Sequence, residues 1–236
     1  MRRDLFFTFH GCRAKKAAEV LTAKRAKNSA RLVFFCQARL KKTNLPIQIK
    51  FARKKGEDMD FKEVKLEDIK LDTYKTIAED WLVLSAGNEN GYGCMTVSWG
   101  QTGSLWKGDG LKPFAGMPVA TVYVRPQRNT KKFIDEQPVF TLSAFNGERK
   151  TELGFLGKRS GKEFADKFAA CGMTPLFIDG SVAAKEANTI FVCRKHYTYK
   201  IEENGFFYPE TVVQNYPNKD FHQAYIGEII KIYKKI

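Results

Sequence analysis

Two loops that follow predicted strands carry the side chains best suited to hold an anion. Arg125, Arg128 and Thr130 come directly after the β-branched run 118–124, so we expect their donors at one strand end. Guanidinium groups make forked, charge-assisted hydrogen bonds to phosphate oxygens, and Lys167, further along the chain, can add a point charge. Such a grouping can hold a phosphate, but taken alone two arginines after a strand are more often solvent-exposed surface residues.

The motifs of several common enzyme classes are missing from the sequence. It has no Gly-x-x-x-x-Gly-Lys-Ser/Thr loop, no Gly-x-Ser-x-Gly elbow and no kinase motif, and Gly91-Tyr-Gly93 lacks the third glycine of a dinucleotide fingerprint. The three His and five Cys are too scattered for the ligand spacings of zinc sites. We therefore expect neither phosphoryl transfer, nor covalent serine chemistry, nor a protein-bound metal.

Cysteine usage and hydropathy bear on the location of the protein. The five Cys are odd in number and widely spaced, which argues against a disulfide scaffold and favours a reducing cytoplasm. No apolar run approaches the roughly 20 residues that span a bilayer. The apolar run 5–9 is too short for a secretory signal. The sequence thus predicts a cytoplasmic protein without a membrane partner.

The formal net charge of +14 is concentrated in the first quarter of the chain. Residues 1–58 hold 16 of the 40 Lys and Arg but 4 of the 26 Asp and Glu, whereas 59–236 is nearly balanced. Three interpretations of 1–58 stay open: a polyanion-binding arm, an Arg-rich organelle presequence, or upstream sequence translated from a start codon assigned too early. We favour the third, with Met59 as the native start, because the charge becomes balanced there. Nucleic acid is accordingly not our expected partner.

Residues 59–236 have the pattern of one folded domain, mainly β with short helices. Apolar, β-branched runs between turn residues predict strands at 81–86, 96–99, 118–124, 139–143, 189–193 and 224–230. Helix-boundary residues and spacing predict helices at 151–156 and 162–170. Many strands with few helices between them favour a closed antiparallel barrel, with small helices outside, over a parallel doubly wound sheet.

Six motifs follow one another in order along residues 60–236. They are Trp81-Leu-Val-Leu with Ala86-Gly87, Met95-Thr-Val-Ser-Trp-Gly100, Val124-Arg-Pro-Gln-Arg-Asn-Thr130, Phe140-Thr-Leu-Ser143, Cys193-Arg194 and His222-Gln-Ala-Tyr-Ile-Gly-Glu-Ile229. Their order and spacing resemble the flavin reductase-like family of FMN-binding split barrels, with its flavoredoxin-like subgroup. The chain departs from the family pattern at Asn129, where Tyr is usual, in a segment from Ser160 to Lys167 that is one residue longer, and in an apparent insertion at 107–117.

The resemblance implies a fold and an activity. The fold is an antiparallel FMN-binding split β-barrel, and the activity is that of an NAD(P)H-dependent flavin reductase, an oxidoreductase that passes a hydride to flavin N5. The alternative is a flavoredoxin-like electron carrier that a protein partner reduces. The resemblance also implies a homodimer with a flavin or a redox protein as electron acceptor. No side-chain nucleophile is expected, because the flavin performs the redox chemistry.

The resemblance further assigns flavin contacts. The backbone of 95–98 would run along the isoalloxazine edge, with Trp99 packed beside the ring. His222 is either a proton donor near the flavin or nicotinamide, or a cap of the turn before the last strand. The expected cofactor-binding residues are Met95, Thr96, Val97, Ser98, Trp99, Arg125, Arg128, Asn129, Thr130, Ser160 and Lys167.

Overall fold

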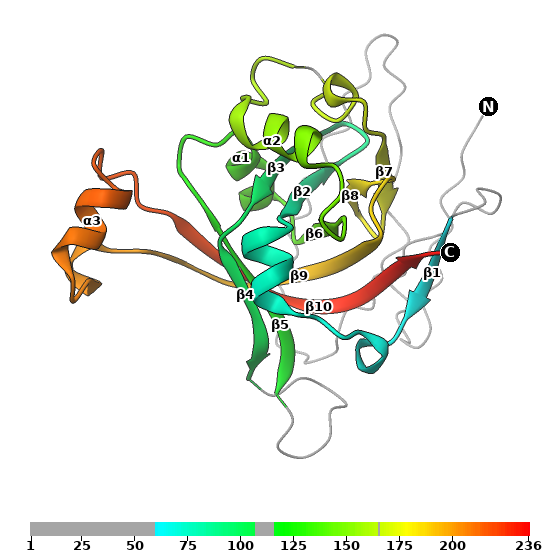
Figure 1. Cartoon of the computed structure of the whole chain (residues 1–236), viewed down its shortest axis with the longest axis horizontal. Coiled ribbons are helices and arrows are strands. Elements are labelled where there is room, and N and C mark those ends of the chain that lie inside the picture. The colour runs from blue at the N-terminus through cyan, green and yellow to red at the C-terminus, as the bar shows by residue number, and fades with distance from the viewer. Residues whose placement is uncertain (1–59, 107–115, 165) are drawn as a thin grey trace, which may run out of the picture. The chain divides into compact units, whose positions relative to one another are not determined.

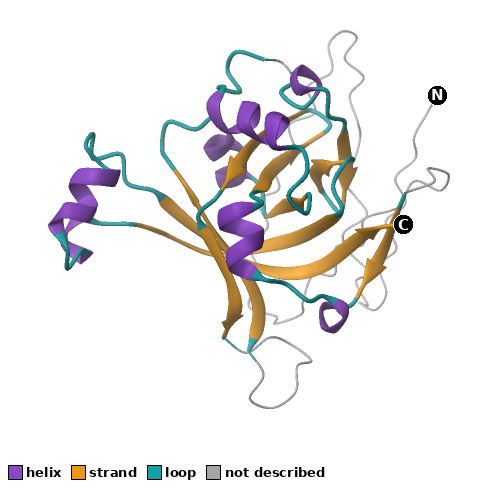
Figure 2. Ribbon diagram, in the orientation of Figure 1, coloured by secondary structure: helices purple, strands orange, loops and turns teal. Residues whose placement is uncertain are grey.

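The computed structural model describes residues 60–106, 116–164 and 166–236. The basic segment 1–58, the proposed start at Met59 and most of the apparent insertion at 107–117 lie outside the described residues. The described part of the chain contains ten strands and three short α-helices, as the strand-rich pattern predicted (Figure 2). None of these helices is both long and apolar enough to cross a membrane.

The elements follow in chain order. The strands are β1 (Phe61–Val64), β2 (Leu82–Asn88), β3 (Gly91–Val97), β4 (Gly100–Leu105), β5 (Met117–Val124), β6 (Val139–Ala144), β7 (Pro175–Ile178), β8 (Ser181–Ala184), β9 (Thr189–Lys200) and β10 (Gln223–Lys235). The α-helices are α1 (Thr130–Glu136), α2 (Lys150–Lys158) and α3 (Pro209–Asn215). Shorter helical turns occupy Leu66–Asp68, Lys75–Glu79, Ala169–Cys171 and Glu203–Gly205.

Eight strands form one antiparallel sheet in the order β3-β2-β6-β9-β10-β5-β4, with β1 paired to β10, while β7 and β8 form a separate hairpin. The edge strands β3 and β4 lie at opposite ends of this order, yet only Ser98 and Trp99 separate them in the chain. The sheet must therefore curl until its two edges meet at this corner, which is barrel geometry. No ladder joins β3 to β4 within the described residues, so the expected closed barrel is instead split at this seam.

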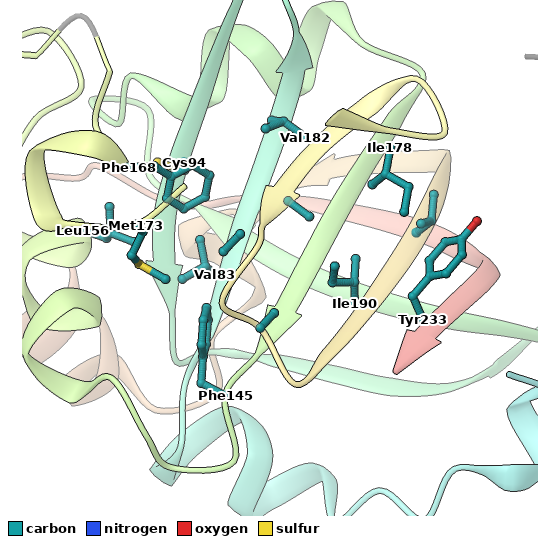
Figure 3. Close-up of a cluster of buried hydrophobic side chains, with 14 of the residues drawn as sticks. Val83, Cys94, Phe145, Leu156, Phe168, Met173, Ile178, Val182, Ile190 and Tyr233 are labelled. Carbon is teal, nitrogen blue, oxygen red and sulfur yellow. The ribbon is translucent and has the colours of Figure 1, made fainter. Parts of the chain in front are cut away.

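Side chains that alternate along the strands fill two cores, one on each face of the curled sheet. Leu84 and Phe140 belong to the inner core. Val83 and Ile190 belong to the outer core, which Figure 3 shows. The β7-β8 hairpin and α2 supply the covering residues of the outer core, such as Leu156. Strands β2 and β6 are therefore buried on both faces, which explains why their sequences are mostly apolar rather than alternating between apolar and polar residues.

Two buried hydroxyls of β6 attach the covering hairpin to the sheet. Thr141 Oγ1 donates to the carbonyl oxygen of Val182 at 2.5 Å, and Ser143 Oγ accepts the N–H of Ala184 at 3.2 Å. Both hydroxyls are thus satisfied by the backbone of β8, so the polar residues of the Phe-Thr-Leu-Ser motif are compatible with full burial.

The predicted strands at 81–86, 118–124 and 139–143 and the helix at 151–156 are confirmed to within two residues at each end, whereas the strands predicted at 189–193 and 224–230 form but continue to Lys200 and Lys235. The strand predicted at 96–99 ends at Val97. The helix predicted at 162–170 is wrong, because among the described residues of this range the one helical turn is Ala169–Cys171. Polar side chains explain the difference: Ser160 Oγ accepts the N–H of Lys162, and Asp166 Oδ1 accepts the N–H of Ala169. Such local bonds compete with helical ones.

The strands β9 and β10 continue past the barrel and carry residues 201–221, which we call the arm; α3 lies within it (Figure 1). The arm has a small core of its own, made by Val212, Tyr216 and Phe221. It also exposes large apolar side chains, with Phe207 95% and Val213 73% accessible. The arm is therefore a separate packing unit at the end of two long strands.

Candidate functional site

A cleft of about 290 Å³ lies where the loop after β5, the end of α2 and the following turn meet. It is lined by Met95, Gln127, Arg128, Asn129, Thr130, Lys158, Arg159, Ser160, Gly161, Glu163 and Lys167. Six of these eleven residues are among the predicted flavin contacts, so the fold brings together side chains from distant parts of the sequence. Four of the lining side chains are cationic and one is a carboxylate, a balance that favours a ligand with more than one negative charge.

Lys167 is the buried cation of the cleft, with 6% of its surface exposed. Its Nζ donates to the carbonyl oxygen of Cys94 in β3 at 3.1 Å and to that of Leu156 in α2 at 2.5 Å. Both acceptors are neutral backbone groups, so these bonds orient the ammonium without neutralising it. Burial lowers the pKa of Lys167 below its ordinary value. An anion beside this ammonium would relieve the cost of burying an isolated charge.

Arg128 lies at the same end of α2. Its Nη1 donates to the carbonyl oxygen of Gly157 at 2.6 Å. The last carbonyls of a helix have no partner within the helix and carry the negative end of its dipole, so Arg128 and Lys167 both stabilise this terminus. Burial, and then the nearby charge of Arg125, lower the pKa of the Arg128 guanidinium. A guanidinium has five N–H donors, so the bond to Gly157 leaves capacity for ligand oxygens.

Two glycines allow the loop after β5 to approach the rest of the cleft. A Cβ at Gly161 would lie 2.7 Å from Nδ2 of Asn129, and a Cβ at Gly93 would lie 2.8 Å from Cα of Thr130. A larger residue at position 93 would push the backbone of this loop away, and one at position 161 would displace the side chain of Asn129. Asn129 and Thr130 therefore face the turn at Ser160 because small residues stand opposite them, which completes the cleft between two loops far apart in sequence.

The predicted ring-binding segment 95–99 runs from the cleft to the surface. Met95 lines the cleft and packs in the inner core, and Val97 is buried in the same core. Thr96 points the other way, and its Oγ1 donates to the carbonyl oxygen of Leu153 in α2 at 2.5 Å. Ser98 and Trp99 are exposed at the seam of the barrel. The structure thus brings Met95 into the cleft and places Thr96, Val97, Ser98 and Trp99 beside it or beyond it.

Arg125 is not among the residues that line the cleft. Its Nη1 pairs with Oδ2 of Asp220 at 2.5 Å, and its Nη2 donates to the carbonyl oxygen of Asn215 at 2.8 Å. The guanidinium also lies over the ring of Tyr216, 5.2 Å from its centroid. The hydrogen bond from Arg125 is the main reason that the pKa of Asp220 is lowered. Arg125 therefore fastens the arm to the end of β5.

His222 lies beside this arginine at the start of β10. The centroid of its ring is 5.0 Å from that of the Trp99 ring, and its Nδ1 is 2.9 Å from the hydroxyl oxygen of Tyr216. Burial, reinforced by the charge of Arg125, lowers the pKa of His222 to about 4. The imidazole is therefore neutral at pH 7. This environment does not favour an imidazolium acid, and the bond of the ring is to a side chain, that of Tyr216, rather than to a backbone group of the turn.

Sequence reasoning missed part of the cleft wall: Gln127, Lys158, Arg159, Gly161 and Glu163. One signal was available, since Lys158 and Arg159 directly precede the predicted contact Ser160. Their exposed side chains add positive charge at the cleft mouth. Arg159 also lies 3.7 Å from Glu163, which places the single carboxylate of the lining next to a cation.

Comparisons with known proteins identify the fold. No protein-family model matches the chain, and a search of the curated proteins finds no significant match. Among solved structures, the FMN-binding domain of a flavin reductase-like enzyme from Shewanella baltica has 17% identity and a TM-score of 0.51, over 76% of this chain and 80% of that one. Flavoredoxin from Methanosarcina acetivorans has 16% identity and a TM-score of 0.47, over 66% and 68% of the two chains.

An NADH:FAD oxidoreductase of Streptomyces globisporus, solved with NAD and FAD fragments, has 15% identity and a TM-score of 0.47, over 66% of this chain and 74% of that one. At these identities the similarity concerns the fold. The strand order and the split seam of this chain indicate a split barrel, and the match to the Shewanella domain supports the same fold. The chain therefore has the split-barrel fold of the FMN-binding, flavin reductase-like domains.

Proposed function

We propose that this chain binds FMN, with the flavin phosphate in the cleft, and acts as an NAD(P)H-dependent flavin reductase. The observation that carries the proposal is Lys167, a buried ammonium whose two hydrogen-bond acceptors are neutral carbonyls, in a cleft whose wall has three further cations. A phosphate monoester carries close to two negative charges at pH 7 and has three acceptor oxygens. The charge and the donors of the cleft match those of such a ligand.

The donor set supports this assignment residue by residue. Arg128 and Lys167 would hold the phosphate at the end of α2, and the hydroxyls of Thr130 and Ser160 line the same cleft. Lys158 and Arg159 would add a positive field at the mouth, where exposed charges contribute less than buried ones. Met95 borders the cleft and begins the segment that leads to Trp99, so the backbone of 95–98 stays our proposed ring contact.

The protein's part in the reaction is binding and orientation. When bound, the flavin supplies the redox chemistry, taking a hydride from NAD(P)H at N5 and passing electrons to an acceptor flavin or redox protein. Backbone N–H groups of 95–98 would stabilise negative charge at the ring edge. His222, neutral at pH 7 and bonded to Tyr216, would orient Trp99 rather than supply a proton.

We further propose a homodimer, which the exposed apolar side chains of the arm support. Phe207, Tyr208 and Val213 are all at least 69% exposed, and apolar surface of this kind commonly marks a protein interface. Light scattering of the purified full chain should give the mass of two chains. A monomeric mass at micromolar concentration would contradict this part of the proposal.

The activity is tested directly with the full chain, loaded with FMN under anaerobic conditions. NADH or NADPH is added, and the visible absorption of the flavin is followed. Prompt bleaching is the expected result, and it also identifies the nicotinamide donor. Bound flavin that stays yellow with both donors would contradict the reductase and support the flavoredoxin-like carrier. A chain that binds no flavin would contradict both functions.

A further inference from the structure

We propose that Tyr92 is a positioning residue: its hydroxyl fixes Asp166 and, through it, the turn that holds Lys167 in the cleft. The inference rests on the proposed function, because it treats Lys167 as a ligand of the flavin phosphate. Neither Tyr92 nor Asp166 is part of the cleft wall. Their effect on a ligand would therefore pass through Lys167.

A shared carboxylate oxygen links Tyr92 to this turn. The hydroxyl of Tyr92, in β3, donates to Oδ1 of Asp166, and the same oxygen accepts the backbone N–H of Ala169 at 2.9 Å. Lys167 lies between Asp166 and Ala169 in the chain, so its backbone sits within the loop that this oxygen closes. Burial, and then Asp166, raise the pKa of the Tyr92 hydroxyl, which keeps the tyrosine a proton donor in this bond.

Two neighbouring contacts attach the same segment to β3. The ring of Tyr92 stacks on that of Phe168, with centroids 5.6 Å apart and planes at 28°. Nζ of Lys167 reaches the carbonyl oxygen of Cys94, two residues beyond Tyr92 on the strand. Three consecutive residues, 166–168, thus contact a short stretch of one strand. The carboxylate of Asp166 is the polar part of this attachment, and the stacked rings are its apolar part.

A lysine needs such a fixed backbone if its ammonium is to stay buried. The side chain has four rotatable bonds and strong hydration, so it gains entropy and solvation by turning outward. When the turn is loosened, part of the population will place Nζ of Lys167 outside the cleft. The affinity for a phosphate should then fall, while the affinity for an uncharged ligand of the same ring system should not.

The test compares Tyr92→Phe with Tyr233→Phe in the full chain. Both substitutions remove a hydroxyl that donates to an aspartate, and both leave in place a ring of the outer core, partly buried at Tyr92 and fully buried at Tyr233; Tyr233 bonds Oδ2 of Asp179 at 2.6 Å, away from the cleft. Dissociation constants for FMN and riboflavin are measured by flavin fluorescence. Tyr92→Phe should weaken FMN about fivefold, in line with one hydrogen bond, and leave riboflavin unchanged. Tyr233→Phe should change neither constant.

A second variant guards against an unstable Tyr92→Phe chain. Asp166→Asn keeps the size of the side chain but weakens the hydrogen-bond acceptor. It should likewise weaken the binding of FMN and leave that of riboflavin unchanged. If Tyr92→Phe and Asp166→Asn both bind FMN as the wild type does, or lose affinity for FMN and riboflavin equally, the positioning role is overturned while the phosphate site stands. A wild-type chain without preference for FMN over riboflavin would overturn the phosphate site, and the inference with it.

Discussion

Arg125 and Arg128 stand three residues apart in one loop, yet their surroundings differ in the property that matters for ligand binding. Arg125 is already paired with the carboxylate of Asp220 and with a carbonyl of the arm. Arg128 donates to the carbonyl of Gly157 and lines a cleft that also contains Lys167. Arg125 therefore attaches the arm to the end of β5, whereas Arg128 leaves positive charge in the cleft for a ligand.

The comparison extends to the other groups of the two regions. Next to the arm, His222 is kept neutral by burial and by Arg125, whose charge is paired with Asp220 of the arm. In the cleft, burial lowers the pKa values of both Lys167 and Arg128, and their hydrogen bonds go to neutral carbonyls. Binding of a flavin phosphate should accordingly depend on the cleft. The stability of the fold at low pH should depend on the arm and the adjoining His222.

The largest expected effect concerns His222 and acid stability. Its pKa is about 4 in the folded chain and 6.5 in the reference state, so only the unfolded chain gains a proton as the pH falls below 6.5. The free energy of unfolding should therefore fall by about 3 kcal/mol between pH 7 and pH 4 on account of this residue. Urea unfolding across this range, for wild type and His222→Gln, measures the contribution. Equal pH slopes for the two chains would show that His222 is not buried neutral.

Replacement of Lys167 should cause the largest loss of FMN affinity. Lys167→Met keeps the length of the apolar stem but removes the ammonium, and a charge-assisted hydrogen bond of about 2 kcal/mol corresponds to roughly 30-fold weaker FMN binding. Riboflavin, which lacks the phosphate, should bind as before. Titration calorimetry with both flavins checks this. Lys231→Met is the matched control, since Lys231 pairs with Asp179 outside the cleft, and it should leave both affinities unchanged.

Substitution of the two arginines should separate binding from stability. Arg128→Ala is expected to weaken FMN about tenfold, whereas Arg125→Ala should leave FMN affinity within about twofold of wild type. Arg125→Ala should instead lower the free energy of unfolding by about 1–3 kcal/mol, because Asp220 and the carbonyl of Asn215 lose their partner. FMN titrations and urea unfolding of both variants provide the four values. A large loss of FMN affinity in Arg125→Ala would contradict the purely structural role of Arg125.

The smallest effect is a pH dependence of FMN affinity. Burial lowers the pKa of Lys167, so its charge is lost at a lower pH than that of an exposed lysine, and affinity should fall severalfold as the pH rises through that value. Below about pH 6 the phosphate gains a proton, and affinity should fall again. Riboflavin affinity measured in parallel should be flat. Lys167→Met should lack the alkaline decline, and its persistence there would assign the titration to another group.

Much of the fold follows from sequence because its main determinants are local. Runs such as 118–124 and 139–143 combine β-branched and apolar residues between turns, and they form β5 and β6. The wrong helix at 162–170 had suitable spacing, but Ser160 and Asp166 satisfy its backbone groups in turns. The open seam between β3 and β4 depends on pairing across the whole sheet, which no local pattern encodes.

For the candidate site, the sequence predicted several of the residues that line the cleft but not the partners of the cations. The residues that meet in the cleft were found because ordered motifs named their loops, and the fold then brings Arg128, Ser160 and Lys167 together. The motifs could not show which cationic side chains are already bonded to carboxylate or carbonyl groups of the protein. Asp220, the partner of Arg125, lies 95 residues further along the chain, and the carbonyls that hold Lys167 belong to Cys94 and Leu156. Such pairing is a property of tertiary structure.

The central claim is that the cleft exists to hold a flavin phosphate, and one comparison tests it most directly. The affinities of the wild-type full chain for FMN and for riboflavin are measured side by side at pH 7. We expect FMN to bind at least about 30-fold more tightly, since in the proposed site Arg128 and Lys167 would contact the phosphate and not the ring system. Equal affinities for the two flavins would contradict the assignment of this cleft.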